Sequence, residues 1–154
     1  MEISAVTRPT EAVRRLISEL DGELGALYEP QQRHSLAWEQ LFAPHIRFFA
    51  VMEGAKALGC GGVALFADFA EVKRMYVRPA ARGRGLADTL MTRLVAEARQ
   101  AGLHVLRLET GTDSHAAIRF YRRHGFRDCP AFDPYAALPP HRIAASLFME
   151  RDLA

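Results

Sequence analysis

The segment Arg82-Gly83-Arg84-Gly85-Leu86-Ala87 constrains this chain more than any other stretch. It follows a strand-like run that ends at Pro79, and it opens a helical run from Gly85 to Ala101. The first backbone N–H groups of such a helix have no partner inside it, and the helix dipole adds partial positive charge there. Two glycines allow a close approach to the backbone, and two arginines add cations. The segment therefore predicts a site for a phosphate or pyrophosphate group.

Other interpretations of this glycine loop are weaker. A glycine-rich connection between a strand and a helix can be only a turn, with its arginines solvated. A Walker A loop needs Gly-Lys-Ser/Thr at its end, and the chain has no such sequence. A dinucleotide-binding fingerprint needs a third small residue where Asp88 stands, and it should follow the first strand of a parallel sheet.

The hydrophobic pattern predicts a mixed α and β fold. Helices are expected over residues 10–20, 35–43 and 85–101, with a short one ending at His124. Strands are expected over residues 46–52, 57–66, 69–78, 104–109 and 143–151. Short linkers are expected at Asp21-Gly22, Glu53-Gly54 and residues 137–141. The first three strands favour an antiparallel meander, and the helix between residues 69–78 and 104–109 makes those two strands parallel neighbours.

Composition narrows the class of protein. The chain has 154 residues, so we expect one domain over residues 1–154. Its net charge of +2 favours neither nucleic acid nor a membrane surface as a partner. No apolar run is long enough for a membrane span, and the first ten residues lack a signal-peptide core, so we expect a cytoplasmic protein with Cys60 and Cys129 reduced. The six scattered histidines predict no metal site.

Two segments together resemble a known family. Residues 82–87 match the Gln/Arg-x-x-Gly-x-Gly/Ala signature of the GNAT superfamily of N-acyltransferases, and residues 117–126 resemble its Ala-Ile-x-x-Tyr-x-x-x-Gly-Phe segment. The resemblance covers residues 45–153 well, whereas the first 44 residues match only as a strand followed by helices. It implies an α+β GNAT fold: a mixed central sheet of about six to seven strands with about four helices. The antiparallel meander would come first, and a central parallel pair would splay apart to receive a coenzyme.

The resemblance also implies which residues hold acetyl-coenzyme A (acetyl-CoA). The backbone of residues 75–77 would receive the pantetheine arm, and the glycine loop would hold the pyrophosphate. Ser114 stands where members often carry asparagine, which leaves its contact with the coenzyme in doubt. The full set of expected cofactor-binding residues is Met75, Tyr76, Val77, Arg82, Gly83, Arg84, Gly85, Leu86, Ala87, Ser114 and Phe120.

Acyl transfer from a thioester to an amine needs a base for the amine and an acid for the leaving thiolate. Tyr121 lies four residues before the Gly-Phe pair, where the family's tyrosine is near the coenzyme sulfur, so it is the expected acid. The simpler interpretation is that its ring only packs on the core. Glu71 precedes Arg82 by eleven positions, where histone-type members carry a glutamate base, so it is the expected base. Glu109, at the end of the next strand, is the rival, and pairing with Lys73 or Arg74 could also explain Glu71.

These observations predict an N-acetyltransferase that moves an acetyl group directly from acetyl-CoA to a primary amine, with no metal. One alternative is a catalytically silent acyl-CoA-binding module or sensor. Another is a nucleotide- or phosphate-binding protein of a different fold. Residues 20–45 and 129–142 are expected to grip the acceptor, which is a small-molecule amine or a protein or peptide amine. The sequence is also compatible with a homodimer.

Overall fold

Seven strands form a single mixed sheet in the computed structural model, which describes residues 1–154. Their order across the sheet is β1-β2-β3-β4-β5-β7-β6, and every neighbouring pair is antiparallel except β4 and β5. The strands are β1 (Glu2–Ala5), β2 (Ile46–Glu53), β3 (Lys56–Leu65), β4 (Ala70–Val77), β5 (Val105–Gly111), β6 (Arg127–Asp128) and β7 (Ser146–Asp152). The expected meander and the expected parallel pair are therefore both confirmed.

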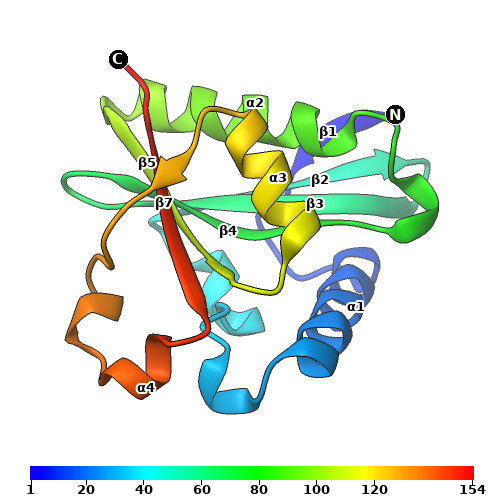
Figure 1. The fold of residues 1–154 in the computed structure, drawn as a ribbon. Coiled ribbons are helices and arrows are strands. Elements are labelled where there is room, and N and C mark those ends of the chain that lie inside the picture. The colour runs from blue at the N-terminus through cyan, green and yellow to red at the C-terminus, as the bar shows by residue number, and fades with distance from the viewer.

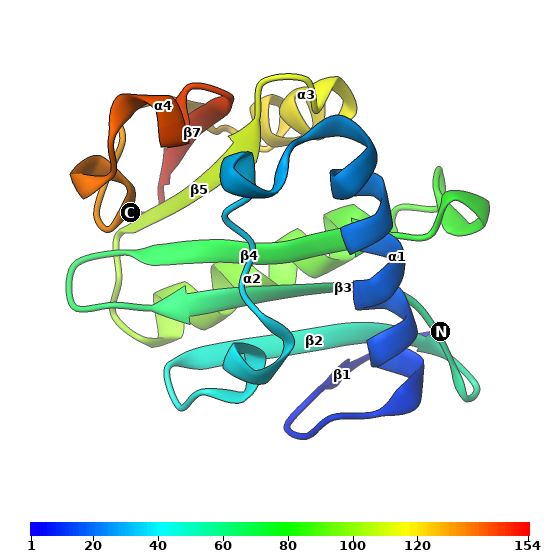
Figure 2. The same ribbon diagram turned by 90° about the horizontal axis from the view of Figure 1, so that it is seen from below.

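Helices cover both faces of this sheet. Figures 1 and 2 show α2 along one face and α1 along the opposite face, across β2, β3 and β4. The α-helices are α1 (Glu11–Leu27), α2 (Leu86–Gln100), α3 (His115–Arg123) and α4 (Pro140–Ile143). Short 3-10 helices lie at Pro30–Gln32, Trp38–Phe42, Pro79–Ala81 and Tyr135–Ala137. The α+β architecture expected from the sequence, a mixed sheet with helices on both faces, is confirmed.

Each face has its own hydrophobic core. The larger cluster lies between α2 and the sheet. It contains Leu90 and Leu94, which are completely buried and follow the four-residue spacing seen in the sequence. The second cluster lies between α1 and the sheet, and it contains Leu16 of α1. The two main helices are therefore packed on opposite faces of the sheet, and both contact β4.

The parallel pair β4–β5 is joined over only two residues. Ala70 pairs with Leu106 and Glu71 with Arg107, and the strands then separate. A register shift in the β3–β4 pairing, opposite Gly61, accompanies this separation, and Arg74 there has a φ of 55°. A bulge of this kind bends a strand and increases its twist. The side chain of Arg74 holds the bulge, because Nη1 contacts Asp21 at 2.6 Å and Nε donates to the carbonyl of Leu36 at 2.9 Å.

Several boundaries expected from the sequence were wrong. Asp21-Gly22 does not end the first helix, because α1 runs on to Leu27 and Asp21 is held in mid-helix by its ion pair with Arg74. The helix expected over residues 35–43 is a single 3-10 segment. The last strand begins at Ser146, three residues late, because α4 occupies Pro140–Ile143, within the expected linker and strand start.

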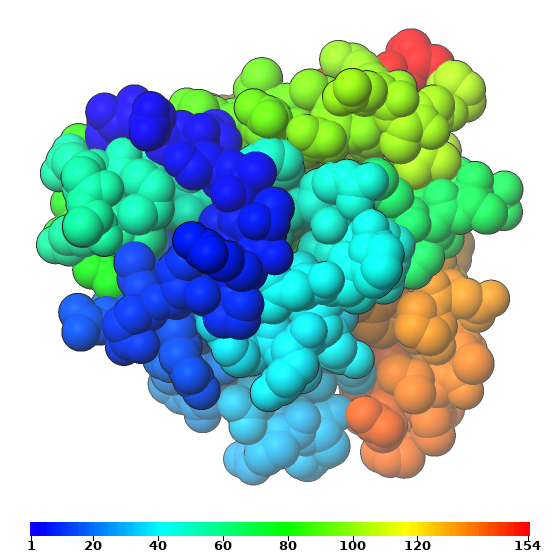
Figure 3. All heavy atoms as spheres, turned by 180° about the vertical axis from the view of Figure 1, so that it is seen from behind, coloured from blue at the N-terminus to red at the C-terminus, as the bar shows by residue number.

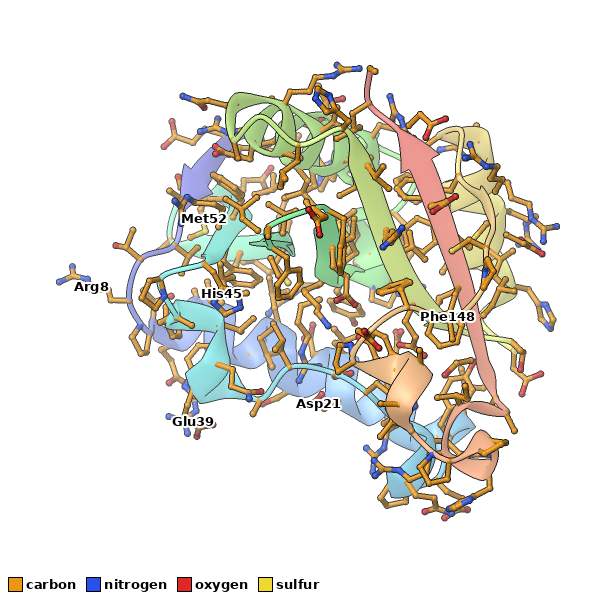
Figure 4. The ribbon with its side chains drawn as sticks, turned by 90° about the vertical axis from the view of Figure 1, so that its left-hand side faces the viewer. Arg8, Asp21, Glu39, His45, Met52 and Phe148 are labelled. Atoms are coloured by element: carbon orange, nitrogen blue, oxygen red, sulfur yellow. The ribbon has the colours of Figure 1, made fainter.

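The segment between β6 and β7 packs as a third, small cluster. Phe132, Tyr135 and Phe148 are buried together, with ring centroids 5.4–5.6 Å apart. Figure 4 labels Phe148 on β7 beside this segment, and Figure 3 shows the segment (orange) as a lobe distant from the N-terminal strand. Both cysteines are free thiols, and none of the helices is long and apolar enough to cross a bilayer.

Candidate active site

One cleft of about 820 Å³ follows the opening between β4 and β5. Its walls come from the second half of α1, the residues just after it, β4, the end of β5, the N-terminus of α2, and α3. All of the site residues expected from the sequence line this cleft except Glu71 and Arg84. Segments far apart in the chain therefore meet along one continuous groove.

The N-terminus of α2 forms one end of the cleft. The backbone N–H groups of residues 83–88 donate to no acceptor in the protein. Gly83 and Gly85 have φ angles of 78° and 77°, and no heavy atom lies within 4 Å of the position that a Cβ would take on either. A helix N-terminus with this many free donors and open space favours an anionic group.

The two arginines of the loop behave differently. Arg82 lines the cleft, where its Nε donates to the carbonyl of Val77 at 2.9 Å and its Nη2 contacts Glu23 of α1 at 3.1 Å. Arg84 turns away from the cleft and contacts Glu53 at 3.2 Å. The structure therefore leaves one arginine, not two, beside the free N–H groups.

The middle of the cleft is the open edge of β4. Met75, Tyr76 and Val77 line it, and beyond Glu71 the backbone of β4 has no strand partner on the β5 side. An extended ligand carrying amide groups can add to such an edge as another strand would. Phe120 and Ser114 of the α3 segment face the same groove.

Tyr121 combines a packed ring with a free hydroxyl. The ring is 8% exposed and contacts Phe120 and Phe126 edge-on, with centroids 5.5 and 5.7 Å away. The hydroxyl makes no hydrogen bond within the protein, although the residue lines the cleft. Burial raises the pKa of Tyr121 well above its usual range, and the charge of Glu109 raises it further. The side chain is therefore a protonated donor at neutral pH.

Glu109 supplies the carboxylate on the cleft wall. Its Oε2 accepts a hydrogen bond of 2.7 Å from the Ser146 hydroxyl. Burial raises the pKa of Glu109 above its usual range, and the hydrogen bond from Ser146 opposes that rise. A carboxyl group with a raised pKa is a better proton acceptor than an exposed one.

The sequence matches known proteins along most of its length. Residues 12–126 match the acetyltransferase (GNAT) family. The chain belongs to this family. An IAA acetyltransferase from Azospirillum brasilense is 42% identical over 145 residues, which cover 93% of this chain and 92% of that protein. The uncharacterized N-acetyltransferase YedL from Escherichia coli is 36% identical over 121 residues, which cover 77% of this chain and 76% of YedL.

Solved structures agree with this assignment. A structure from Klebsiella pneumoniae, assigned to the acyl-CoA N-acyltransferases, has 34% identity and a TM-score of 0.82, and the match covers 99% of this chain and 97% of that one. The PaiA N-acetyltransferase from Thermoplasma acidophilum, solved with coenzyme A, shares the fold at 17% identity and a TM-score of 0.73, with 99% of each chain covered. This GNAT protein is therefore an acyltransferase.

Glu71 of this GNAT protein lies behind the cleft wall. It is 1% exposed, and its Oε2 accepts a hydrogen bond of 2.6 Å from Tyr135 and contacts Lys73 Nζ at 2.9 Å. Lys73 Nζ also donates to the Tyr135 hydroxyl at 2.8 Å, which closes a triangle of polar groups. The other carboxylate oxygen of Glu71, Oε1, is buried and accepts no hydrogen bond. Glu71 thus ties β4 to the segment between β6 and β7.

Tyr28, at the C-terminus of α1, crosses to the opposite wall of the cleft. Its hydroxyl lies 2.9 Å from the Ser114 hydroxyl and accepts a hydrogen bond of 3.1 Å from the N–H of Asp113. A Cβ at Gly111 would overlap the Tyr28 ring, so only glycine fits there with the ring in place. Ser114 therefore uses its hydroxyl on Tyr28 and makes no capping hydrogen bond to α3.

No local sequence pattern indicated the role of Tyr28 in the site. A lone tyrosine after a helix is ordinary, and its contact with the β5–α3 turn spans more than 80 residues of sequence. The glycine in Glu109-Thr110-Gly111 was the one available hint, because a glycine that ends a strand often marks a close approach.

Proposed function

We propose that this protein is an acetyl-CoA-dependent N-acetyltransferase that transfers the acetyl group directly to a primary amine. The observation that carries the proposal is the single cleft, in which the free N–H groups of residues 83–88, the open edge of β4, Tyr121 and Glu109 follow one another. Each stretch of the cleft has the chemistry that one part of the reaction needs.

The cleft would hold coenzyme A along the N-terminus of α2 and the open edge of β4. The N–H groups of residues 83–88 and the guanidinium of Arg82 would hold the pyrophosphate, with Gly83, Gly85, Leu86 and Ala87 allowing its approach. The backbone of Met75–Val77 would bind the pantetheine amides. Arg84 stays outside the cleft, so we assign it only a long-range electrostatic contribution.

When bound, acetyl-CoA supplies a thioester carbonyl for the amine to attack and a thiolate as leaving group. Tyr121 donates its proton to that sulfur, because its hydroxyl lines the cleft without a partner in the protein and is protonated at neutral pH. Glu109 takes the proton from the amine nitrogen as the C–N bond forms and the C–S bond breaks. No covalent bond to the enzyme is required.

Glu109, rather than Glu71, is the base in this proposal. Glu109 faces the cleft with a raised pKa, whereas Glu71 is enclosed by Lys73 and Tyr135 and does not reach the cleft wall. Glu71 would then position the Tyr135 segment and would not touch the amine. The role first expected for Glu71 stays a prediction that the variants below compare directly.

The test is calorimetric titration with acetyl-CoA, followed by thiol release with a panel of amines. We expect saturable binding that is lost in Gly85→Asp, and thiol release that depends on an amine. Binding without thiol release for any amine would favour the silent acyl-CoA-binding module instead. Absence of binding at millimolar acetyl-CoA would refute the proposal, and binding of ATP or NAD in its place would favour a nucleotide-binding protein.

A further inference from the structure

Part of the cleft lining has no role in the proposed binding of coenzyme A. Leu20, Leu24 and Leu27 of α1 contribute apolar side chains to this lining, and Leu27 is 54% exposed. Residues 32–35, at and just after the end of the first 3-10 helix, line the same cleft. The α1 side of the cleft therefore offers apolar surface as well as a short polar segment.

Arg33 differs from every other arginine on the cleft wall. Arg74 contacts Asp21, Arg82 contacts Glu23 and Arg123 contacts Asp88, each within 3.1 Å. Arg33 has no carboxylate within ion-pair distance and donates no side-chain hydrogen bond to the protein. It is the one guanidinium along the cleft whose charge the protein itself leaves unmatched.

The surroundings of Arg33 make that isolation costly. Its Nε is shielded from solvent and has no acceptor. Its Nη1 lies over α1, 3.6 Å from where a Cβ on Gly25 would stand. A guanidinium has five N–H donors in a planar fork that matches a carboxylate, and a shielded donor without an acceptor costs free energy. A carboxylate arriving in the cleft would match the charge of this guanidinium and use its free donors.

The segment that carries Arg33 also lies close to the proposed base. His34 Nε2 donates a hydrogen bond of 2.8 Å to the backbone carbonyl of Arg142, which fixes the segment against α4. Burial dominates the raised pKa of Glu109, but the charge of His34 acts on that carboxyl group in the opposite direction. The segment that carries Arg33 and the proposed base thus line the same cleft.

We infer that the acceptor is an α-amino acid with an apolar side chain, whose carboxylate is bound by Arg33. The amine would lie at Glu109, the carboxylate at Arg33, and the side chain against Leu20, Leu24 and Leu27. This inference rests on the proposed function, because it names the amine that the same cleft acetylates. An amine without a carboxylate would leave Arg33 unpaired beside the bound substrate.

The test compares acceptors that differ only in the carboxylate. Thiol release is measured with acetyl-CoA and either L-leucine or L-leucinamide, and again with L-methionine or L-methioninamide. The amides have more weakly basic amines, so more of each amide is in the reactive form and a preference for the free acid is a stringent result. We expect kcat/KM for the acid to exceed that for the amide by about tenfold or more, as a charge-assisted contact predicts.

Two variants assign that preference to its residue. In Arg33→Gln the acid-to-amide ratio of kcat/KM should fall by about 10- to 100-fold, and Arg33→Lys should give an intermediate value because it keeps the charge but loses the fork. Arg142→Gln is the matched control, because its Nε is also buried without an acceptor but the residue does not line the cleft. The control should keep the wild-type ratio, and calorimetry with acetyl-CoA should show intact coenzyme binding in all three variants.

Several results would overturn the inference while leaving the proposed function standing. These are equal use of leucine and leucinamide, an unchanged ratio in Arg33→Gln, and transfer to other amines without any transfer to apolar amino acids. Failure to bind acetyl-CoA would instead refute the proposed function itself.

Discussion

The contact between Tyr28 and Gly111 leads to a sharp prediction about a single methyl group. Gly111→Ala places a Cβ where the Tyr28 ring now lies, so the ring has to leave its site. The backbone of Gly111 is not in the left-handed region, and alanine can adopt it without strain. Any cost of the substitution therefore comes from the displaced tyrosine.

The size of that cost follows from what Tyr28 loses. Two hydrogen bonds, to Ser114 and to the N–H of Asp113, contribute about 1 kcal/mol each. Tyr28 is 6% exposed, and burial of a large side chain contributes about 1.5–3 kcal/mol. We expect Gly111→Ala to lower the free energy of unfolding by about 3.5–5 kcal/mol, or the melting temperature by roughly 10–15 °C for a domain of this size.

A double-mutant cycle measured by urea unfolding tests this reasoning. Tyr28→Ala removes the ring, so adding Gly111→Ala to it should be neutral or stabilise by about 0.4–1 kcal/mol through the unfolded state. Tyr28→Phe is the milder control, which loses only the hydrogen bonds, about 2 kcal/mol. If Gly111→Ala lowers the free energy of unfolding equally with and without Tyr28, the overlap between the new Cβ and the Tyr28 ring is not the cause.

The remaining predictions concern the reaction. Tyr121→Phe should lower kcat by about 10²–10⁴-fold with little change in coenzyme affinity, and unchanged turnover at saturation would remove Tyr121 from the mechanism. Gly85→Asp should abolish acetyl-CoA binding in calorimetry while the circular dichroism stays native, because it adds a carboxylate where an anion would bind. Glu109→Gln should lower kcat/KM by a similar factor, whereas Glu71→Gln should affect stability more than turnover, and the reverse order would restore Glu71 as the base. The raised pKa of Glu109 means that its carboxylate forms at a higher pH than usual, so kcat/KM should rise with pH through that raised value. The folded protein also binds the Glu109 proton more tightly than the unfolded chain does, so the Glu109 carboxyl lowers the free energy of unfolding as pH rises. Urea unfolding should therefore show that Glu109→Gln is more stable than wild type at neutral pH and not at low pH.

The sequence predicted the framework of the molecule well, because its strongest signals are local. The four-residue spacing of Leu86, Leu90 and Leu94 predicted α2, and residues 82–87 predicted the glycine loop at its N-terminus. The family resemblance then supplied the split between β4 and β5, which no local pattern encodes. The continuation of α1 past Asp21-Gly22 was missed, since Asp21 contacts Arg74, 53 residues away, and no local pattern reveals that contact.

The site was predicted in part for the same reason. The site residues expected from the two motifs line the cleft with the exception of Arg84, which turns away and contacts Glu53. Spacing from Arg82 placed Glu71 on the correct strand, but it could not reveal that Tyr135 closes over it. Arg33 and Tyr28 belong to no sequence motif. Their place in the cleft follows only from the packing of α1, β5 and α3.

The separation of β4 from β5 also has a consequence for solubility. A continuous sheet has two outer edges, whereas this one has two further edges that face each other inside the molecule. Unpaired strand edges are templates for pairing with other chains, and proteins usually blunt or cover them. Here α1 and α3 flank the gap, and Tyr28 bridges from one side to the other, so a foreign strand has no straight path to the open hydrogen-bonding groups. The fold thereby keeps an aggregation-prone surface available to a narrow ligand and closed to another polypeptide.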